Sequence, residues 1–437
     1  MSNKFINIIK SIYKGTFFIK LREQYFDRIV SLSEKDVLKK QEKLLKRILT
    51  HAVKNTNFYN DYFKDKSFKS LTDFPIVNKH FITKNHKDFC VRDLDKYQYG
   101  DSYTGGSTGE PFHILSNGGY EYEFGIKRWN TYGYKEGELL IALDGSKIDN
   151  ELLNQGIYWK KKPGNNLPFG TFALSSLYFK DDNADIYCKY IVETKPDYIR
   201  GYPSFVYSIA CYAEKNGWDI GKSVKAIELT SENAYPYQIE KIKTVFGARV
   251  YLQYGHTEAC ICANTYDETY RYRVEPLYGY VEILNEEDRH VNEGEIGEVV
   301  VTTLHNYAMP LIRYRTGDYA EYGGKDGRYI YLNRILGRTQ DYIIDKNGNK
   351  VLLTALIFAQ HCNALGHITK WQLEQNIKGE VIAHIVKGTE YTDKDEEEIY
   401  NLFKKSGNVN TTFDYVKEIP LTPRGKSKML KQNIVLD

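Results

Sequence analysis

A glycine-rich segment near residue 100 carries the densest set of groups that could hold an anion. It runs Tyr103-Thr104-Gly105-Gly106-Ser107-Thr108-Gly109-Glu110-Pro111. Glycines let backbone N–H groups approach an anion closely, and hydroxyl side chains donate further hydrogen bonds. No Gly-Lys-Ser/Thr ending follows, so this is not a P-loop. The segment indicates a phosphate cradle of another kind, although a surface turn explains the composition equally well.

Two further segments combine a carboxylate with hydroxyl groups. Gln253–Ala259 follows a predicted strand, and α/β sheets place ligands in loops at the carboxyl ends of strands. Thr257 and Glu258 within it offer the oxygen ligands that Mg²⁺ prefers. Arg313–Asp318 ends in an aspartate that could accept two hydrogen bonds from a ribose diol. The alternatives are an ordinary polar loop and a turn aspartate paired with arginines.

Two basic segments follow later in the chain. Gly337–Asp341 contains Arg338, which could reach ribose or phosphate with two hydrogen bonds or form a structural ion pair. Pro420–Lys428 places Lys426 after a glycine on a proline-flanked loop, from which it could reach a developing anion. A solvated surface cluster is the simpler explanation of these C-terminal lysines.

The elements that must position these segments follow an α/β pattern. Residues 1–70 are predicted to be helical, because apolar residues recur every three to four positions, as in Asp36–Ala52. From about residue 97, short strands and helices alternate, which favours an α/β fold. The expected strands are 139–143, 198–199 and 250–253, and the expected helices are 186–194, 204–215 and 235–246.

From Gly279 the pattern is rich in strands, which are predicted at 280–284, 297–303, 320–322 and 329–332. Asn347-Gly348 between two apolar arms is a strong hairpin signal. Strands at 371–377, 381–386 and 412–416 and helices at 354–364 and 393–404 complete a small α+β unit. We therefore predict a large N-terminal domain over 1–337, with parallel and mixed sheets, helices and a β-rich subdomain. A hinge at 338–342 and a small α+β domain at 343–437 follow.

Composition narrows the classes of partner. The 437 residues are 42% hydrophobic, and 60 basic and 57 acidic residues give a net charge of +3, which gives no support to nucleic-acid binding. Six scattered cysteines favour reduced thiols and a cytoplasmic address. No apolar run reaches the roughly 20 residues of a bilayer span. The basic, amphipathic first 20 residues leave peripheral contact with a membrane open.

The order and spacing of the five segments resemble the adenylate-forming superfamily, in particular its phenylacetate–CoA ligase-like and CapK-like branch of capsule-biosynthesis proteins. Asp73–Lys79 is similar to that branch's LPILTK element, Gly201–Ser204 to its GYPS element, and Thr230–Asn233 lies where the family has GSEP. The resemblance covers nearly the whole chain. It implies an ATP-dependent ligase that activates a carboxylate as acyl-AMP, releases pyrophosphate and transfers the acyl group to CoA or an amine.

The resemblance also implies a role for each matching residue. The ATP triphosphate would be oriented by Thr104, Gly105, Gly106, Ser107, Thr108 and Gly109. The adenine would be bordered by Ser231, Glu232, Asn233, Tyr254 and Gly255. Thr257 would bind the α-phosphate, Glu258 the Mg²⁺ and Asp318 the ribose hydroxyls, and Arg338 would contact ribose or phosphate. Lys426 would bridge the substrate carboxylate and the α-phosphate, and leave when the mobile small domain rotates about its hinge.

The candidate acyl pocket consists of Tyr132, Gly201, Tyr202, Pro203 and Ser204, although the tyrosines could simply be core residues. The chain departs from the family at Glu110, where a lysine is common, and at Gln340, where the hinge residue is often aspartate. Cys260 and Cys262, with His256 and His305, raise the question of zinc. Two cysteines and distant histidines are a weak signal, so we expect buried thiols rather than a structural zinc site.

Two other functions compete with the ligase. A catalytically silent scaffold that binds nucleotide or an acyl ligand is disfavoured by the joint presence of Lys426, Glu258 and Asp318. A sugar-phosphate nucleotidylyltransferase would place its glycine-rich loop at the first strand, whereas here the loop begins after residue 100. The CapK-like branch suggests a substrate tied to cell-surface polysaccharide, and a homodimer is compatible with the resemblance.

Overall fold

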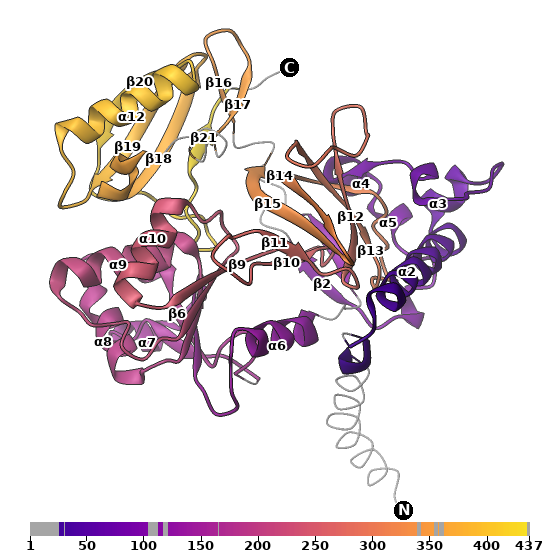
Figure 1. Ribbon diagram of the computed structural model, residues 1–437, viewed down its shortest axis with the longest axis horizontal. Helices are drawn as coiled ribbons and strands as arrows, with labels where there is room; N and C mark the ends of the chain where they lie inside the picture. Colours follow the sequence, from indigo (N-terminus) through magenta and orange to yellow (C-terminus); the bar gives the residue numbers. More distant parts are fainter. Residues whose placement is uncertain are drawn as a thin grey trace, which may run out of the picture.

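A computed structural model describes residues 26–29, 31–103, 112–116, 121–164, 166–338, 342–353, 357 and 362–434. Within them, a 13-stranded sheet runs in the order β12-β13-β14-β15-β11-β10-β9-β8-β7-β4-β6-β5, with β1 paired to β14. A separate four-stranded sheet with one long helix lies beside it (Figure 1). The predicted α/β class, with a large mixed sheet and a small α+β domain, is confirmed.

One half of the large sheet is parallel. Its strands are β6 (Phe172–Ser175), β4 (Leu140–Asp144), β7 (Tyr198–Gly201), β8 (Ala226–Thr230) and β9 (Arg249–Gly255), with β5 (Trp159–Lys161) antiparallel at the edge. The helices of this half are α7 (Asn150–Asn154), α8 (Ala184–Thr194), α9 (Pro203–Asn216) and α10 (Pro236–Phe246). Residues 140–143 are all buried, as is typical of strands covered on both faces. Because the strands are parallel, their carboxyl ends meet at one edge.

The other half is antiparallel, with short connections. Its strands are β10 (Cys262–Asn264), β11 (Tyr272–Val274), β15 (Tyr329–Arg338), β14 (Tyr314–Asp326), β13 (Ile296–Thr303) and β12 (Gly279–Leu284). A two-residue turn with Gly327 at φ +56° joins β14 to β15. Both strands are longer than predicted and carry register shifts, which hide a regular alternation in the sequence.

The N-terminal part packs helices against the antiparallel half. The elements are α2 (Glu34–Asn55), α3 (Asn57–Tyr62), β1 (Val77–Asn78), α4 (Lys79–Lys84) and α5 (His86–Phe89). Ser33 caps α2 by accepting a hydrogen bond from Asp36 N, and Ile48, Leu49 and Ala52 form its buried face. The hairpin β2 (Gly100–Tyr103) and β3 (His113–Ser116) precedes α6 (Glu121–Thr131). None of the described helices is long and apolar enough to cross a membrane.

The small domain has the strand order β20 (Asn410–Tyr415), β19 (Glu380–Lys387), β18 (Ile368–Ile377), β21 (Leu430–Gln432), with α12 (Asp393–Ser406) packed on it. The predicted hairpin is present as β16 (Tyr342–Ile344) and β17 (Lys350–Leu352), with Gly348 at φ +93°. Most of the helix expected at 354–364 lies outside the described residues, as do hinge residues 339–341. The short strand β21 was not predicted.

Candidate active site

The ends of β7, β8 and β9 and the loops after them carry three of the segments that the sequence singles out. Gly201 ends β7, and Pro203 starts α9 with Tyr202 as its N-cap residue. A Cβ on Gly201 would lie 2.6 Å from Val206 Cγ2, so glycine lets helix and strand pack closely there. Ser231, directly after β8, adopts φ +71° and is exposed. Asn233 is half-buried beside it.

A hydrogen-bonded cluster links the end of β9 to β14. The Tyr254 hydroxyl donates to Asp318 Oδ2 at 2.8 Å. His256 Nε2 lies 3.1 Å from the same carboxylate oxygen and 2.7 Å from the Tyr254 hydroxyl. His256 Nδ1 is buried and has no hydrogen-bond partner among the described residues. Arg338 on β15 pairs with Asp318 across the ladder, so the backbone brings both predicted ribose-binding residues together.

The turn after β9 holds the predicted metal ligand. Glu258 is buried, and its Oε1 accepts a hydrogen bond from the Tyr314 hydroxyl at 3.2 Å. Burial raises the pKa of Tyr314, and the neighbouring Glu258 carboxylate adds to that rise, so this hydroxyl stays protonated and fixes the carboxylate. Thr257 and Gly255 are exposed beside it. One carboxylate, one hydroxyl and the phosphates of a nucleotide are a donor set that suits Mg²⁺.

Lys426 is presented by a tight turn between β20 and β21. Gly425 N donates to Thr422 O at 2.8 Å, and Gly425 adopts φ +70°. Thr422 N donates to Lys426 O, while Lys426 N donates to the Thr422 side chain at 3.1 Å. Pro423 and Arg424 fill the two central positions, where proline is favoured. The sequence Thr-Pro-Arg-Gly-Lys therefore encodes a rigid turn, which we call the lysine turn (residues 422–427).

The lysine turn is docked on the large domain. Lys426 Nζ donates to Ser231 O at 2.9 Å and lies 5.4 Å from the centre of the Tyr202 ring. The Glu232 carboxylate accepts from Ser427 N at 2.7 Å and from Ser204 N at 3.1 Å, which joins the two domains. Burial raises the pKa of Glu232, and these donors and the charge of Lys426 oppose that rise.

Three further contacts seat the turn. The Ser176 hydroxyl donates to Gly425 O at 2.7 Å, and Arg424 Nη2 donates to Tyr103 O at 2.6 Å. A Cβ on Gly145 would lie 1.7 Å from Arg424 O, so only glycine leaves room for the turn there. Tyr103 is the first residue of the glycine-rich segment, so the turn contacts the start of that segment.

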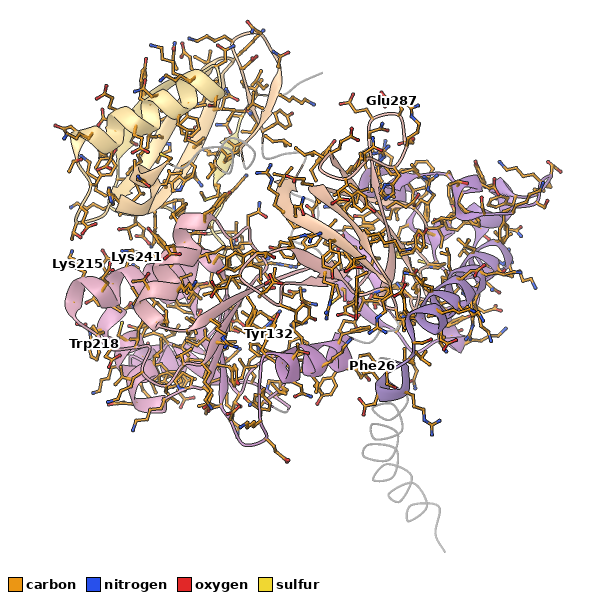
Figure 2. The ribbon with its side chains drawn as sticks, in the orientation of Figure 1. Phe26, Tyr132, Lys215, Trp218, Lys241 and Glu287 are labelled. Atoms are coloured by element: carbon orange, nitrogen blue, oxygen red, sulfur yellow. The ribbon has the colours of Figure 1, made fainter. Side chains whose placement is uncertain are left out.

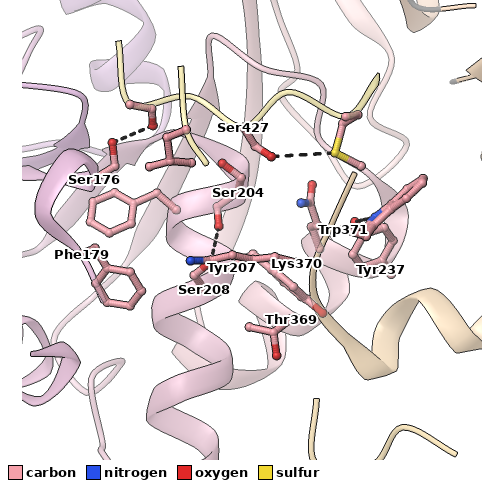
Figure 3. Close-up of a pocket in the computed structure, with 15 residues that line it drawn as sticks. Ser176, Phe179, Ser204, Tyr207, Ser208, Tyr237, Thr369, Lys370, Trp371 and Ser427 are labelled. Atoms are coloured by element: carbon pink, nitrogen blue, oxygen red, sulfur yellow. Dashed lines mark hydrogen bonds between the residues drawn. The ribbon is translucent and has the colours of Figure 1, made fainter. Parts of the chain in front are cut away.

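A pocket beside the lysine turn is lined by both domains (Figure 3). Ser204, Tyr207 and Ser208 of α9 lie on one side, and Lys370 and Trp371 of β18 on the other. Lys370 is half-buried there, and burial lowers its pKa. The pocket exists because the small domain closes over the start of α9.

Several predicted residues lie elsewhere or outside the described part. Tyr132 is a core residue: its ring stacks on Tyr251 with centroids 3.9 Å apart, and its hydroxyl donates to Thr265 O. It follows α6, away from the small domain (Figure 2), among residues that begin the parallel strands rather than end them. The segment Thr104, Gly105, Gly106, Ser107, Thr108 and Gly109 lies outside the described residues, as does the side chain of Arg338.

Cys260 and Cys262 are buried thiols in the apolar interior. Cys260 Sγ donates to Glu258 O, and Cys262 Sγ accepts from the Asn264 side chain at 3.5 Å. Burial raises the pKa of both thiols. Among the described residues, no group of three or more His, Cys, Asp or Glu side chains could hold a metal ion.

Sequence reasoning missed two residues that receive the lysine turn. Gly145 and Ser176 belong to no charged or glycine-rich motif, and only the docked turn reveals their part in the site. His256 was considered only as a metal ligand, whereas here it contacts Tyr254 and Asp318. In the sequence, the position of His256 two residues after Tyr254, at the end of a predicted strand, could have indicated this contact.

Comparisons with known proteins show what the chain is similar to. Residues 343–433 match the model of the CapK C-terminal domain. Protein CapK of Staphylococcus aureus is 25% identical, over 98% of this chain and 97% of its own length. Phenylacetate-coenzyme A ligase of Escherichia coli (strain K12) is 25% identical, over 83% of this chain and 84% of its own length.

Among solved structures, 2-hydroxyisobutyryl-CoA ligase in the postadenylation state, in complex with 2-HIB-AMP, superposes with a TM-score of 0.70 at 16% identity. It covers 91% of this chain and 90% of its own. The same ligase with 2-HIB-AMP and CoA in the thioesterification state gives 0.54 at 16% identity, over 90% of each chain. The arrangement of the two domains is thus more similar to the postadenylation state than to the thioesterification state. The C-terminal domain of the chain thus matches the CapK family, the whole chain is similar to protein CapK and to phenylacetate–CoA ligases, and its fold is that of the adenylate-forming CoA ligases.

Proposed function

We propose that this protein uses ATP to activate a carboxylic acid as acyl-AMP, with release of pyrophosphate, and then transfers the acyl group to CoA or an amine. The observation that carries the proposal is the position of Lys426. Its ammonium group contacts Ser231 O, 195 residues away in sequence, beside Tyr202 and Glu232. A scaffold that only bound nucleotide would not need a cation delivered by a separate domain.

The large domain supplies the nucleotide side of the reaction. Asp318 would accept hydrogen bonds from the ribose, with its carboxylate already held by Tyr254 and His256. Ser231, Glu232 and Asn233, with Tyr254 and Gly255, would border the base, and the glycine-rich segment from Thr104 to Gly109 would hold the phosphates. Preorganised groups of this kind lower a barrier mainly through position and electrostatics.

Lys426 would act where charge develops. A carboxylate oxygen of the acid attacks the α-phosphorus, the bond to the pyrophosphate oxygen breaks, and negative charge accumulates around the phosphorus. The ammonium group, now on Ser231 O, would then bind the carboxylate and an α-phosphate oxygen. Thr257 would donate to the α-phosphate from its exposed position beside the cluster.

Mg²⁺ fits the buried Glu258 carboxylate, which with Thr257 would hold it on the nucleotide. Bound there, the ion would neutralise phosphate charge. The acid itself would lie near residues 201–204, at the start of α9. The sequence resemblance to the capsule-biosynthesis branch suggests a substrate connected with cell-surface polysaccharide, and similarity to phenylacetate–CoA ligases supports CoA as the acceptor.

ATP–pyrophosphate exchange tests the proposal. Purified protein is assayed with Mg²⁺ and a panel of aryl, fatty, amino and uronic acids, together with Lys426→Ala. The matched control is Lys428→Ala, an exposed lysine of the same loop. We expect exchange that depends on one class of acid. It should fall about 100- to 1,000-fold in Lys426→Ala, because a charge that stabilises the transition state is lost, and stay unchanged in Lys428→Ala.

If acid-dependent exchange persists in Lys426→Ala, this lysine does not stabilise the transition state of adenylation. ATP binding without exchange on any acid of the panel would favour the binding scaffold. No ATP binding would contradict the nucleotide assignment of Asp318, Ser231 and Glu232 as a whole.

A further inference from the structure

A second cavity lies at the N-terminal end of the described chain, where α2 and α6 meet. Its volume is about 310 Å³, which is in the range of small-molecule pockets. It shares no residue with the lysine turn, with the pocket beside that turn or with the Tyr254–Asp318 cluster. Phe26 marks its position near the N-terminus in Figure 2.

One part of the cavity wall is apolar and rigid. Phe26 and Phe124 meet edge to face, with centroids 4.8 Å apart, and belong with Ile29 and Leu277 to one buried cluster. Leu44 of α2 packs against that cluster. These side chains offer an acyl chain or a ring a surface that is already ordered, so little entropy is lost when it binds.

The other part of the wall is cationic. Lys40, Lys43 and Arg47 line it from α2, at the three- and four-residue spacing that places side chains on one helix face. Arg47 lies over the Tyr307 ring, 5.1 Å from its centre, and His305 Nε2 donates to Leu277 O. Lys43 and Arg47 form no ion pair with a described residue, and no described carboxylate lines the cavity.

We infer that this cavity binds an amphiphilic phosphate, a molecule that joins an apolar chain or ring to a phosphate group. The two charges of Lys43 and Arg47 exceed what a single carboxylate would neutralise, whereas a phosphate monoester carries a charge of about −1.5 to −2. Arginine can bind a phosphate through two hydrogen bonds, and lysine binds it as a point charge. The apolar wall beside the cations requires a ligand that has both parts.

Calorimetry with dihexanoyl phosphatidic acid, kept monomeric, tests the inference on the full chain. Inorganic phosphate and dihexanoyl phosphatidylcholine are the comparison ligands, since the first lacks the chains and the second has no net charge. The test variant is Lys43→Gln/Arg47→Gln. The matched control is Lys39→Gln/Lys46→Gln, two exposed lysines of the same helix that do not line the cavity.

We expect one site for phosphatidic acid in the wild type and the control, and binding at least about tenfold weaker in Lys43→Gln/Arg47→Gln. Both comparison ligands should bind the wild type at least about tenfold more weakly. Equal affinity in the two double variants, equal affinity for inorganic phosphate, or no binding by the wild type would overturn the inference. Lys43→Gln alone leaves the Arg47–Tyr307 contact in place and replaces the double variant if that one misfolds.

Flotation with phosphatidylcholine vesicles, with and without phosphatidic acid, separates the two sources of such a ligand. Both double variants keep residues 1–25, so any difference between them comes from α2. Vesicle binding that is lost in Lys43→Gln/Arg47→Gln identifies a membrane lipid as the source. Monomer binding without vesicle binding identifies a soluble amphiphilic phosphate. Either outcome supports binding of an amphiphilic phosphate in this cavity.

Discussion

The two walls of the candidate active site are built in different ways. The wall from the large domain consists of residues that follow β8 and β9 or lie on β14, and buried hydrogen bonds such as Tyr314–Glu258 and Tyr254–Asp318 fix it. The part of the small domain that carries Lys426 is a turn without regular secondary structure. Its polar contacts with described residues of the large domain include those made by Arg424, Gly425, Lys426 and Ser427.

We therefore expect the wall of the large domain to hold the nucleotide and the turn of the small domain to bring Lys426 to it. Each polar contact of the lysine turn contributes about 0.5–3 kcal/mol net, so the turn is held by contacts that are individually weak. The nucleotide wall, by contrast, cannot move without unpairing strands of the main sheet. We therefore propose that the small domain leaves after adenylation while the nucleotide wall stays in place.

The largest effect should come from blocking the seat of the turn. Gly145→Ala would place a Cβ 1.7 Å from Arg424 O, so the turn could not dock and Lys426 would lie outside the site. We expect exchange to fall about 100-fold, as on removing a group that stabilises the transition state, with Tm nearly unchanged. Gly366→Ala is the control, because a Cβ there meets open space. Normal exchange in Gly145→Ala would mean that adenylation uses another position of the turn.

The next effect concerns the fixed wall. Asp318→Asn removes the charge that Tyr254 and His256 orient, and should raise the KM for ATP about 30-fold, because hydrogen bonds to charged groups are worth about 1.5–3 kcal/mol. Asp326→Asn, an exposed residue of the same strand, should leave that KM unchanged. Equal KM values in the two variants would exclude Asp318 from nucleotide binding.

A smaller effect should come from the residue that both walls share. Glu232→Gln replaces one acceptor oxygen by an NH₂ group, which must face the N–H of either Ser204 or Ser427. We expect exchange to fall about tenfold, through kcat rather than the KM for ATP, because docking is weakened while the nucleotide wall remains. Glu240→Gln on the exposed face of α10 is the control. A change in KM alone would assign Glu232 to the nucleotide instead.

The smallest effect on activity should come from the hairpin of the small domain. Burial opposes ionisation of Asp345, but hydrogen bonds from Asn349, Asn408 and Asn347 lower its pKa to about 2. A lowered pKa stabilises the fold above the ordinary value of 3.8, and this stability is lost as the pH falls toward 2. Asp345→Asn should therefore lower Tm at pH 7, and the difference from wild type should shrink below about pH 4. Exchange at 25 °C should stay within about twofold of wild type. A Tm difference that is independent of pH would contradict this assignment.

The regular elements could be predicted because local patterns determine them. The parallel strands at 139–143 and 250–253 and the helices α9 and α10 were expected within one to three residues of their observed bounds. Asn347-Gly348 predicted its hairpin through turn chemistry alone. Strand β21 was not predicted, because its three residues show no hydrophobic periodicity and its formation depends on pairing with β18.

The site could be predicted only where chemistry is visible in residue type. Lys426 and Glu232 both belong to the docked contact between the domains, and Asp318 is held by Tyr254. Tyr132 lies in the core instead, because an aromatic residue looks the same in the sequence of a core and of a pocket. Gly145 and Ser176 are revealed only by the approach of a segment about 250 residues away or more. Their roles depend on tertiary contact rather than on local sequence.

The shared carboxylate has a consequence for redesign. Glu232 accepts from Ser204 at the mouth of the expected acid pocket and from Ser427 next to Lys426, for which we propose a catalytic role. Glu232 would therefore influence both which acids the pocket admits and how the small domain docks on the large domain. A library that varies positions 201–204 to admit new acids will also alter how often the small domain engages. Selections for a new acid should include compensating changes at position 427. Otherwise, weaker docking of the small domain would lower turnover and hide an improved fit of the acid.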